Sequence, residues 1–309
     1  MALTNTTVNY SGVFEVAGMV VSPNGGQVSY VGTAAQQAAL GQVGETIAAR
    51  SFLNINTALA QCVSGRGDYI YVLPGYTENI TADAWSSLAA TDVTVCGLGH
   101  GTNRPILTWT VAGSTMLFDV ANFRLLNCQL FLAGPHVNGT ALTVTAPITI
   151  STAGAEISDC DIWWGFDADQ IVTIGITTTA AADGFRFNRN RCFAETAAVP
   201  TTTFLRLTGT DQLEIDGTQI VGAGSTTAIG PVQQLTTASL KAKITNSIFQ
   251  NTLASSTIAF TAIAGCTGMV DKCSFGVLAS GNGITTGSGL QVTNSKTAVA
   301  GAAGADTTG

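Results

Sequence analysis

One stretch of the sequence carries most of the residue types that chemistry on a polysaccharide would need. Four aspartates surround an adjacent pair of tryptophans: Asp159, Asp161, Asp167, Asp169, Trp163 and Trp164. Polysaccharide-cleaving enzymes use a pair of carboxylates, or clustered aspartates that hold calcium next to a basic residue. No basic residue lies within this stretch to serve as the base of a lyase. We therefore expect a turn position for Asp159 and a lateral protein contact at Trp163 and Trp164, because tryptophan is enriched at interface anchors.

Two further motifs have structural explanations. Asp211, Glu214 and Asp216 form a second acidic group, which includes an alternation with apolar residues that is typical of a strand with an outward polar face. The segment Gly97–Gly101 lacks the third glycine of a dinucleotide-binding loop and the ending of a P-loop, so it indicates a turn between strands. Arg104, just before a proline, is expected to tie this turn down. We expect no catalytic residue and no cofactor.

The cysteines have a regular spacing. Four of the seven lie 32 residues apart: Cys96, Cys128, Cys160 and Cys192. Strands stacked about 4.8 Å apart would bring successive cysteine Cα atoms within disulfide range, but stacked inward side chains run parallel, which makes bridging awkward. The odd count, and an opening without the pattern of a signal peptide, favour free thiols in a reducing cytoplasm. We expect Cys128 and Cys160 to point into the stack. The histidines are His100 and His136 and no CxxC pair occurs, so we expect no metal site.

The elements that must position these residues follow from an internal repeat. A six-residue frame (apolar, any, Asn/Asp-like, small, any, apolar) starts at Leu125, Ile157, Phe187, Ile215, Ile244, Val270 and Val292. Its third position holds residues such as Asn127 and Asn246, which tolerate the left-handed conformation of a tight turn. A chain that revisits one short strand every 22 to 32 residues forms a solenoid of stacked coils. The intervals shorten toward the C-terminus, which predicts that the body tapers or loses its loops there.

The segments before and after the repeat have different expected structures. Residues 1–44 show no repeat phrase but carry apolar runs at Val13–Val21 and Val28–Val31, so we expect an N-terminal arm without coils that a partner covers. An apolar stripe within Glu45–Val63 predicts a capping helix, with Ser51 as a candidate N-cap. Asp68–Ile80 and Val93–Trp109 each read as two strands joined by a turn. We expect the β-helix to occupy residues 45–300. Residues 301–309 form a tail without a pattern, which we expect to be either frayed or ordered only by a neighbouring molecule.

Composition excludes several classes of protein. Charged residues are 10% of the chain, against about 25% in an average soluble protein, while 46% hydrophobic residues suffice to bury a core. The net charge of −7 and the lack of a Lys/Arg cluster argue against nucleic-acid binding. The sequence contains no apolar run of about 18 residues, so it predicts no membrane-spanning helix. The sequence indicates a rigid, β-rich body with a neutral surface rich in threonine.

Three phrases carry a resemblance to a known family: FLNINTALAQC, DYIYVLPGYTENI and VTVCGLGHGTNRPILTW. Together they resemble the opening of pectate-lyase-like right-handed parallel β-helices, in which an amphipathic helix caps the first coil. The version here is similar to β-helix proteins of tailed-bacteriophage virions, over about residues 45–300. The resemblance implies an all-β, single-stranded, right-handed parallel β-helix of about nine coils. Fold alone does not fix function.

The resemblance implies a virion context, and the missing catalytic set favours a structural role. We expect a capsid decoration or cement protein, not an enzyme. It would be made in the host cytoplasm and then bind the major capsid protein at the capsid surface as a homotrimer, without contacting nucleic acid or membrane. The arm of residues 1–44 would contact the capsid or a second protomer. The alternative is a tail spike or fibre domain that binds or cleaves host polysaccharide. A third reading, a cellular pectin-modifying enzyme, is disfavoured by the lack of a signal peptide and of suitable acids.

Overall fold

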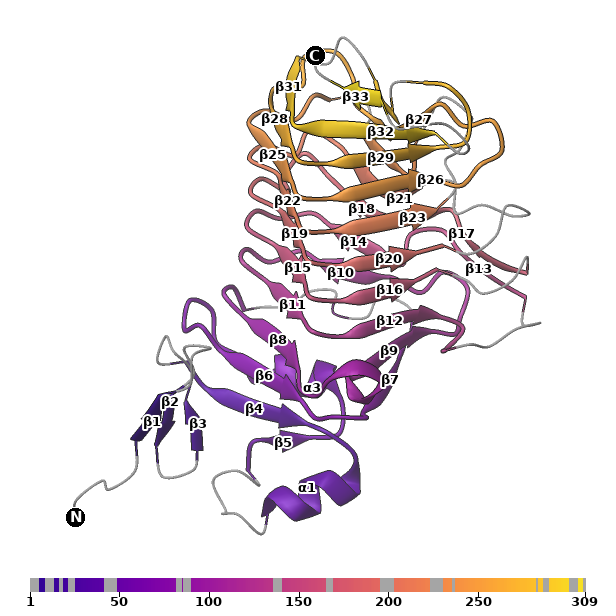
Figure 1. The fold of residues 1–309 in the computed structure, drawn as a ribbon. Coiled ribbons are helices and arrows are strands. Elements are labelled where there is room, and N and C mark those ends of the chain that lie inside the picture. Colours follow the sequence, from indigo (N-terminus) through magenta and orange to yellow (C-terminus); the bar gives the residue numbers. More distant parts are fainter. Residues whose placement is uncertain are drawn as a thin grey trace.

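The chain forms a parallel β-solenoid whose coils stack along one axis (Figure 1). The structure is a computed structural model. It describes residues 6–8, 14–16, 19–21, 26–41, 49–81, 85, 90–135, 141–164, 169–194, 203–222, 230–234, 237–281, 283–285, 289–299 and 305–307. Three sheets, called the first, second and third sheet below, form the faces of the solenoid. The expected all-β parallel β-helix is therefore confirmed.

The first sheet has eleven strands. From the C-terminal to the N-terminal end of the body they are β31 (Leu290–Thr293), β28 (Gly268–Asp271), β25 (Ala242–Thr245), β22 (Glu214–Asp216), β19 (Arg186–Asn188), β15 (Glu156–Ser158), β11 (Arg124–Leu126), β8 (Thr94–Gly97), β6 (Tyr69–Val72), β4 (Val28–Val31) and β5 (Ser51–Phe52).

The second sheet has ten strands. In the same direction they are β33 (Ala305–Thr307), β32 (Ser295–Val299), β29 (Ser274–Val277), β26 (Ile248–Asn251), β23 (Gln219–Gly222), β20 (Arg191–Phe193), β16 (Asp161–Trp163), β12 (Gln129–Leu132), β9 (Ile106–Trp109) and β7 (Thr77–Ile80). The strand β33 pairs antiparallel with β32. Part of the C-terminal tail is thus ordered by the chain itself, which corrects the expectation of a tail that is frayed or ordered only by a neighbouring molecule.

The third sheet has seven strands. In chain order they are β10 (Met116–Phe118), β14 (Ile148–Ile150), β18 (Ile174–Thr178), β21 (Thr203–Leu207), β24 (Val232–Gln234), β27 (Ile258–Thr261) and β30 (Gly283–Ile284). Seven strands mark six intervals, so the solenoid completes about six full turns rather than the expected nine or so. The difference arises because, within the described residues, the N-terminal coils contribute strands only to the first and second sheets.

Two small sheets lie outside the three faces. The strands β1 (Thr6–Val8), β2 (Phe14–Val16) and β3 (Met19–Val21) form an antiparallel sheet. The strands β13 (Leu142–Val144) and β17 (Gln170–Val172) pair in parallel between the second and third sheets. No helix in the described part of the chain is long and apolar enough to cross a membrane.

The predicted repeat frame matches the strand register. Leu125 pairs with Ile157, Ile157 with Phe187, Ile244 with Val270 and Val270 with Val292. The third frame position has positive φ in every coil, from 48° to 59°: Asn127, Asp159, Arg189, Gly217, Asn246, Lys272 and Asn294. This left-handed residue turns the chain from the first sheet into the second, as predicted.

The fourth frame position fills the inner side of this corner. Its small side chains are at most 3% exposed: Cys128, Cys160, Asn190, Thr218, Ser247, Cys273 and Ser295. Polar members bond to the backbone of the coil below or above. Asn190, for example, donates from Nδ2 to the Ile157 carbonyl (2.8 Å) and accepts from the Cys160 amide (2.9 Å). Hydrogen bonds of this kind remove the cost of burying a polar group.

The N-terminal end departs from prediction in two places. Val28–Val31, expected to lie in an arm without coils, forms β4 and pairs in parallel with β6. It is followed by the helix α1 (Ala34–Gly41). The residues expected to form one long capping helix contain β5 and the short helix α3 (Ile55–Leu59), while residues 42–48 lie outside the described part. Ser51 therefore lies in a strand, and the N-cap of α3 is Asn54, whose side chain accepts from the Thr57 amide (2.8 Å).

The phrase Pro74–Glu78 explains how α3 is fixed to the first coil. Glu78 Oε2 accepts from the Ile55 amide at the start of α3 (2.9 Å) and from the Tyr76 hydroxyl (2.8 Å). Tyr76 Oη also lies within donating distance of the Leu53 carbonyl (2.6 Å). Burial of the carboxyl raises the pKa of Glu78 above its ordinary value. The helix thus closes the end of the core, where Ile55, Ala58 and Leu59 are buried.

Candidate functional site

The acidic stretch at 159–169 is held by arginines from other coils. Asp159 occupies the corner position, and its carboxylate binds Arg189 through two hydrogen bonds of 2.7 Å each. Arg189 holds the same corner position one coil later. Asp159 is therefore a turn residue, as expected, and its carboxylate is shared with the next coil. A paired geometry of this kind fixes the orientation of both side chains.

Arg104 crosses one coil to reach this stretch. It follows the 3₁₀ turn η1 (Gly101–Asn103), and its Nε donates to the Gly101 carbonyl (3.3 Å), which confirms that Arg104 ties down its own turn. The same guanidinium donates to the Asp159 carbonyl (3.0 Å) and forms a short ion pair with Asp161. The Arg104 and Asp161 side chains are only 12% and 14% exposed. A basic group is thus present, although none lies nearby in the sequence.

Of the other two aspartates, the structure describes Asp169. Asp167 lies outside the described residues. Asp169 immediately precedes β17, and its backbone carbonyl accepts from the Leu142 amide (3.0 Å), which aligns the small parallel pair β13–β17. The structure therefore brings Asp159 and Asp161 together with Arg104 and Arg189.

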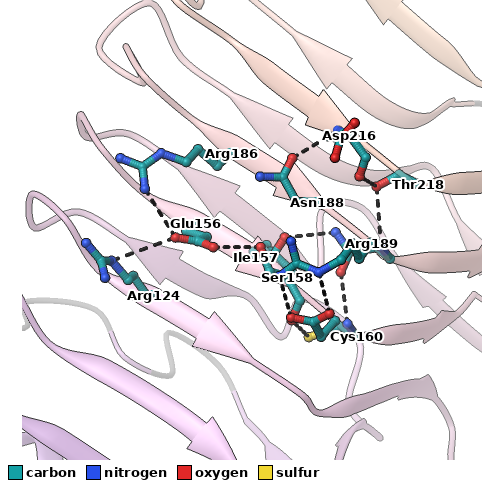
Figure 2. Close-up of polar contacts among 12 residues, drawn as sticks. Arg124, Glu156, Ile157, Ser158, Cys160, Arg186, Asn188, Arg189, Asp216 and Thr218 are labelled. Carbon is teal, nitrogen blue, oxygen red and sulfur yellow. Dashed lines mark hydrogen bonds and ion pairs between the residues drawn. The ribbon is translucent and has the colours of Figure 1, made fainter. Parts of the chain in front are cut away.

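A charged ladder runs up the outer face of the first sheet. Glu156 lies between Arg124 (3.8 Å) and Arg186 (3.4 Å), which occupy the same position in the coils below and above it (Figure 2). Glu214 and Lys243 continue the row and form an ion pair of 2.9 Å. The sign of charge alternates from coil to coil, so each carboxylate has a cation on a neighbouring coil. Sequence reasoning missed this ladder because its members lie 28 to 32 residues apart.

Asp216, from the second acidic group, forms hydrogen bonds that join one coil to the next. Asp216 and Glu214 lie on the outer side of β22, as predicted, on either side of the buried Ile215. The Asp216 carboxylate accepts from the Thr245 hydroxyl and from Asn246 Nδ2 (2.8 Å), both one coil later. These hydrogen bonds, that from Thr245 first, lower the pKa of Asp216.

The same arrangement recurs two coils further on. Asp271 accepts from the Thr293 hydroxyl (2.8 Å) and from Asn294 Nδ2 (2.7 Å). Here the hydrogen bond from Asn294 is the main cause that lowers the pKa of Asp271. An aspartate in one coil and a Thr–Asn pair in the next therefore form a recurrent contact between coils.

The two tryptophans have different environments. Trp164 is 1% exposed, and its ring packs edge-on against Trp109 (5.3 Å) and beside Phe204 (6.1 Å). Gly175 leaves room for it, because a Cβ atom there would overlap the Trp164 indole. The expectation that Trp164 forms a lateral protein contact is therefore wrong, since a core side chain cannot reach a partner. Trp163 is half-buried, and its ring stacks on Phe193 (4.6 Å).

The seven cysteines are free thiols, as expected. Cys128 and Cys160 point inward at the fourth frame position of successive coils. The equal spacing does not make one stack, however, because Cys96 lies opposite Leu126 and Cys192 lies in the second sheet opposite Ile162. Burial raises the pKa of Cys160 to about 12 and that of Cys96 to about 11, which suppresses the reactive thiolate form.

The remaining candidates have no ligand-like arrangement. His100 is the N-cap of η1 in an exposed turn, and His136 lies outside the described residues. Within the described ranges, no three side chains of His, Cys, Asp or Glu gather in a way that could hold a metal ion. A scan against protein-family models finds no match for this chain, and a search of curated proteins finds none either.

Proposed function

We propose that this protein is a structural virion protein, a bacteriophage capsid decoration or cement protein that stabilises the shell as a homotrimer bound to the major capsid protein. One observation carries the proposal. The ionisable side chains of the candidate site bind each other across coils, as in Arg104–Asp161 and Arg189–Asp159. Carboxylates committed to ion pairs support stacking, whereas a catalytic site needs acids or bases that meet a substrate.

The stiffness of the solenoid also supports a structural role on a shell. Ladders of hydrogen bonds, ion pairs and small inward residues make a stiff body. Such a body is suited to bridge neighbouring subunits of a shell, because little conformational entropy is lost when a rigid surface binds. The virion context rests on the three phrases quoted above, which form the N-terminal end of the solenoid between Phe52 and Trp109.

The test is attachment to shells that lack this protein. We expect the full chain to co-sediment with them and a chain without residues 1–25 to stay in the supernatant. The truncation ends before β4, because removing Val28–Val31 would delete a strand of the first sheet. Met269→Ala in the full chain changes an exposed side chain of the first sheet and serves as the control for a surface change; this variant should still bind. Full binding by the truncated chain would move the attachment site onto the solenoid.

A second candidate is a tail spike or fibre domain that binds or cleaves host polysaccharide. It is favoured by the stack of Trp163 on Phe193, with the Arg191 guanidinium 5.6 Å from the Phe193 ring centre. Aromatic faces beside charged groups suit the apolar and hydroxyl faces of a sugar. Release of reducing sugar or unsaturated product from host polysaccharide, lost in Asp161→Asn, would favour this candidate over the first.

A further inference from the structure

The outer face of the third sheet carries one arginine in an otherwise uncharged row. Neighbouring strands place these outward residues in register: Leu117, Thr149, Thr177, Arg206, Gln233 and Thr261. Each is flanked in its own strand by buried residues, which identifies the row as outward-facing. Arg206 donates from Nε to the Thr177 hydroxyl (3.2 Å). No carboxylate of the described residues lies within ion-pair distance of it.

This arginine contrasts with most arginines of the other faces. Arg191 of the second sheet also lacks an ion pair within the described residues, but its guanidinium lies over the Phe193 ring. Arg66, Arg104, Arg124, Arg186 and Arg189 each have a carboxylate within 4.0 Å. Arg206 is partly buried without one. Burial lowers the pKa of Arg206, and no nearby anion offsets that cost. A guanidinium has five N–H donors, and the hydrogen bond to Thr177 uses one of them.

The corner between the third and first sheets carries the complementary charge. Asp183 lies in the turn from β18 to β19 and is exposed. Its Oδ1 accepts from the Asp211 amide (3.0 Å), and no cation of the described residues pairs with it. Arg206 leans onto Thr177 of β18, so its guanidinium lies near the axial level of the turn that contains Asp183. If the three-fold axis of a trimer is parallel to the solenoid axis, it relates groups at the same height along that axis. Arg206 of one copy can then meet Asp183 of the next.

We propose that, in the homotrimer, Arg206 of each copy binds Asp183 of the partner subunit. The inference rests on the proposed trimer and names the surfaces that form it. A closed three-fold ring joins two different patches of the same chain, here the third-sheet face and the adjoining corner. The threonines and glutamine around Arg206 cost less to desolvate than the ion pairs of the first sheet. The chain also has an excess of acids, 19 against 12 basic residues.

The experiment measures the trimer–monomer equilibrium of purified full-length protein by sedimentation equilibrium. Arg206→Gln and Asp183→Asn should each raise the dissociation constant about tenfold or more, since each removes one charge from every contact of the ring. Arg191→Gln is the matched control, because it removes the same charge from the second sheet at a neighbouring position; its effect should stay within about twofold. Thermal unfolding of each variant confirms that the fold is kept.

A charge swap tests the pair itself. Arg206→Asp and Asp183→Arg should each prevent assembly, and the double variant should recover most of it. An unchanged dissociation constant in Arg206→Gln, equal weakening in Arg191→Gln, or no recovery in the double variant would overturn the contact and leave the trimer standing. A wild-type protein that is monomeric both in solution and on shells would instead overturn the trimer of the proposed function.

Discussion

Arginines on the outer face of the first sheet bind a carboxylate of a neighbouring coil, whereas the arginine on the outer face of the third sheet has none among the described residues. On the first sheet, Arg124 and Arg186 share Glu156 in adjacent coils. On the third sheet, Arg206 has a threonine below it and a glutamine above it in the same register. On the outer face of a sheet, a charge meets its opposite in register when the next coil presents one, as Glu156 does for Arg124 and Arg186. Arg206 has no such neighbour, which is why we propose that a partner subunit supplies the anion.

The largest loss of stability is expected from the buried member of the tryptophan pair at the end of β16. Trp164→Ala should lower the free energy of unfolding by about 3–5 kcal/mol, because it leaves a cavity between Trp109 and Phe204. Trp163→Ala should cost about 1 kcal/mol, because the half-buried ring loses mainly its stacking on Phe193. Chemical denaturation measures both. Equal losses in the two variants would contradict the assignment of Trp163 to the surface.

The next effect separates a shielded ion pair from an exposed one. Arg104→Ala should cost about 3 kcal/mol, because Asp161 is then left nearly buried without its cation. Arg124→Ala is the comparison. It should cost less than about 1 kcal/mol, since the 3.8 Å pair is long, the Arg124 side chain is 37% exposed and Arg186 also binds Glu156. If Arg124→Ala proved the more costly variant, the ladder rather than the Arg104 contact would hold the coils together.

The cap of the N-terminal end predicts a pH dependence of opposite sign to that of the first-sheet aspartates. Burial raises the pKa of Glu78 above its usual 4.5, so the folded state holds this proton more tightly than the unfolded state. Its contribution to stability is present below pH 4.5 and is lost as pH rises through the folded pKa. Glu78→Gln should therefore gain stability relative to wild type with rising pH. A difference that is constant from pH 4 to pH 8 would be the contrary result.

The smallest effect concerns the contact of Asp216 with Thr245 and Asn246. The pKa of Asp216 is lowered in the folded state, so its contribution is present above the ordinary value of 3.8 and is lost as pH falls through the folded pKa. Asp216→Asn should cost about 1 kcal/mol at pH 7 and almost nothing in strong acid. Denaturation at the two pH values checks this. An equal cost at both would mean that packing, and not charge, holds this contact.

The sequence was sufficient for the coils because the frame is local. Asn127, Asp159 and Asn246 mark corners within a few residues, and the structure has all three left-handed. The sequence was insufficient for the ion pairs. Arg104 and Asp161 come from coils two apart, so predicting their contact requires the exact lengths of both intervening coils. Strand alternation could have separated Trp163 from Trp164, because adjacent residues of a strand point to opposite sides.

The capping helix shows a different kind of error. The apolar stripe at 45–63 favours one long helix, but Ser51–Phe52 pairs with β4, and strand pairing across the chain overrides local periodicity. The spacing of Asn54 and Thr57 was a usable signal for the true start of α3, because an Asn side chain commonly caps a helix at this distance.

We propose that this β-solenoid decorates a capsid, and locating the protein on the particle tests that proposal. The measurement is electron cryomicroscopy of particles with and without the protein, followed by assignment of the extra density. We predict three-fold density over the shell at many sites, with the end that carries β1–β3 toward the capsid. Density confined to the tail, or the same map from both kinds of particle, would contradict the proposed function.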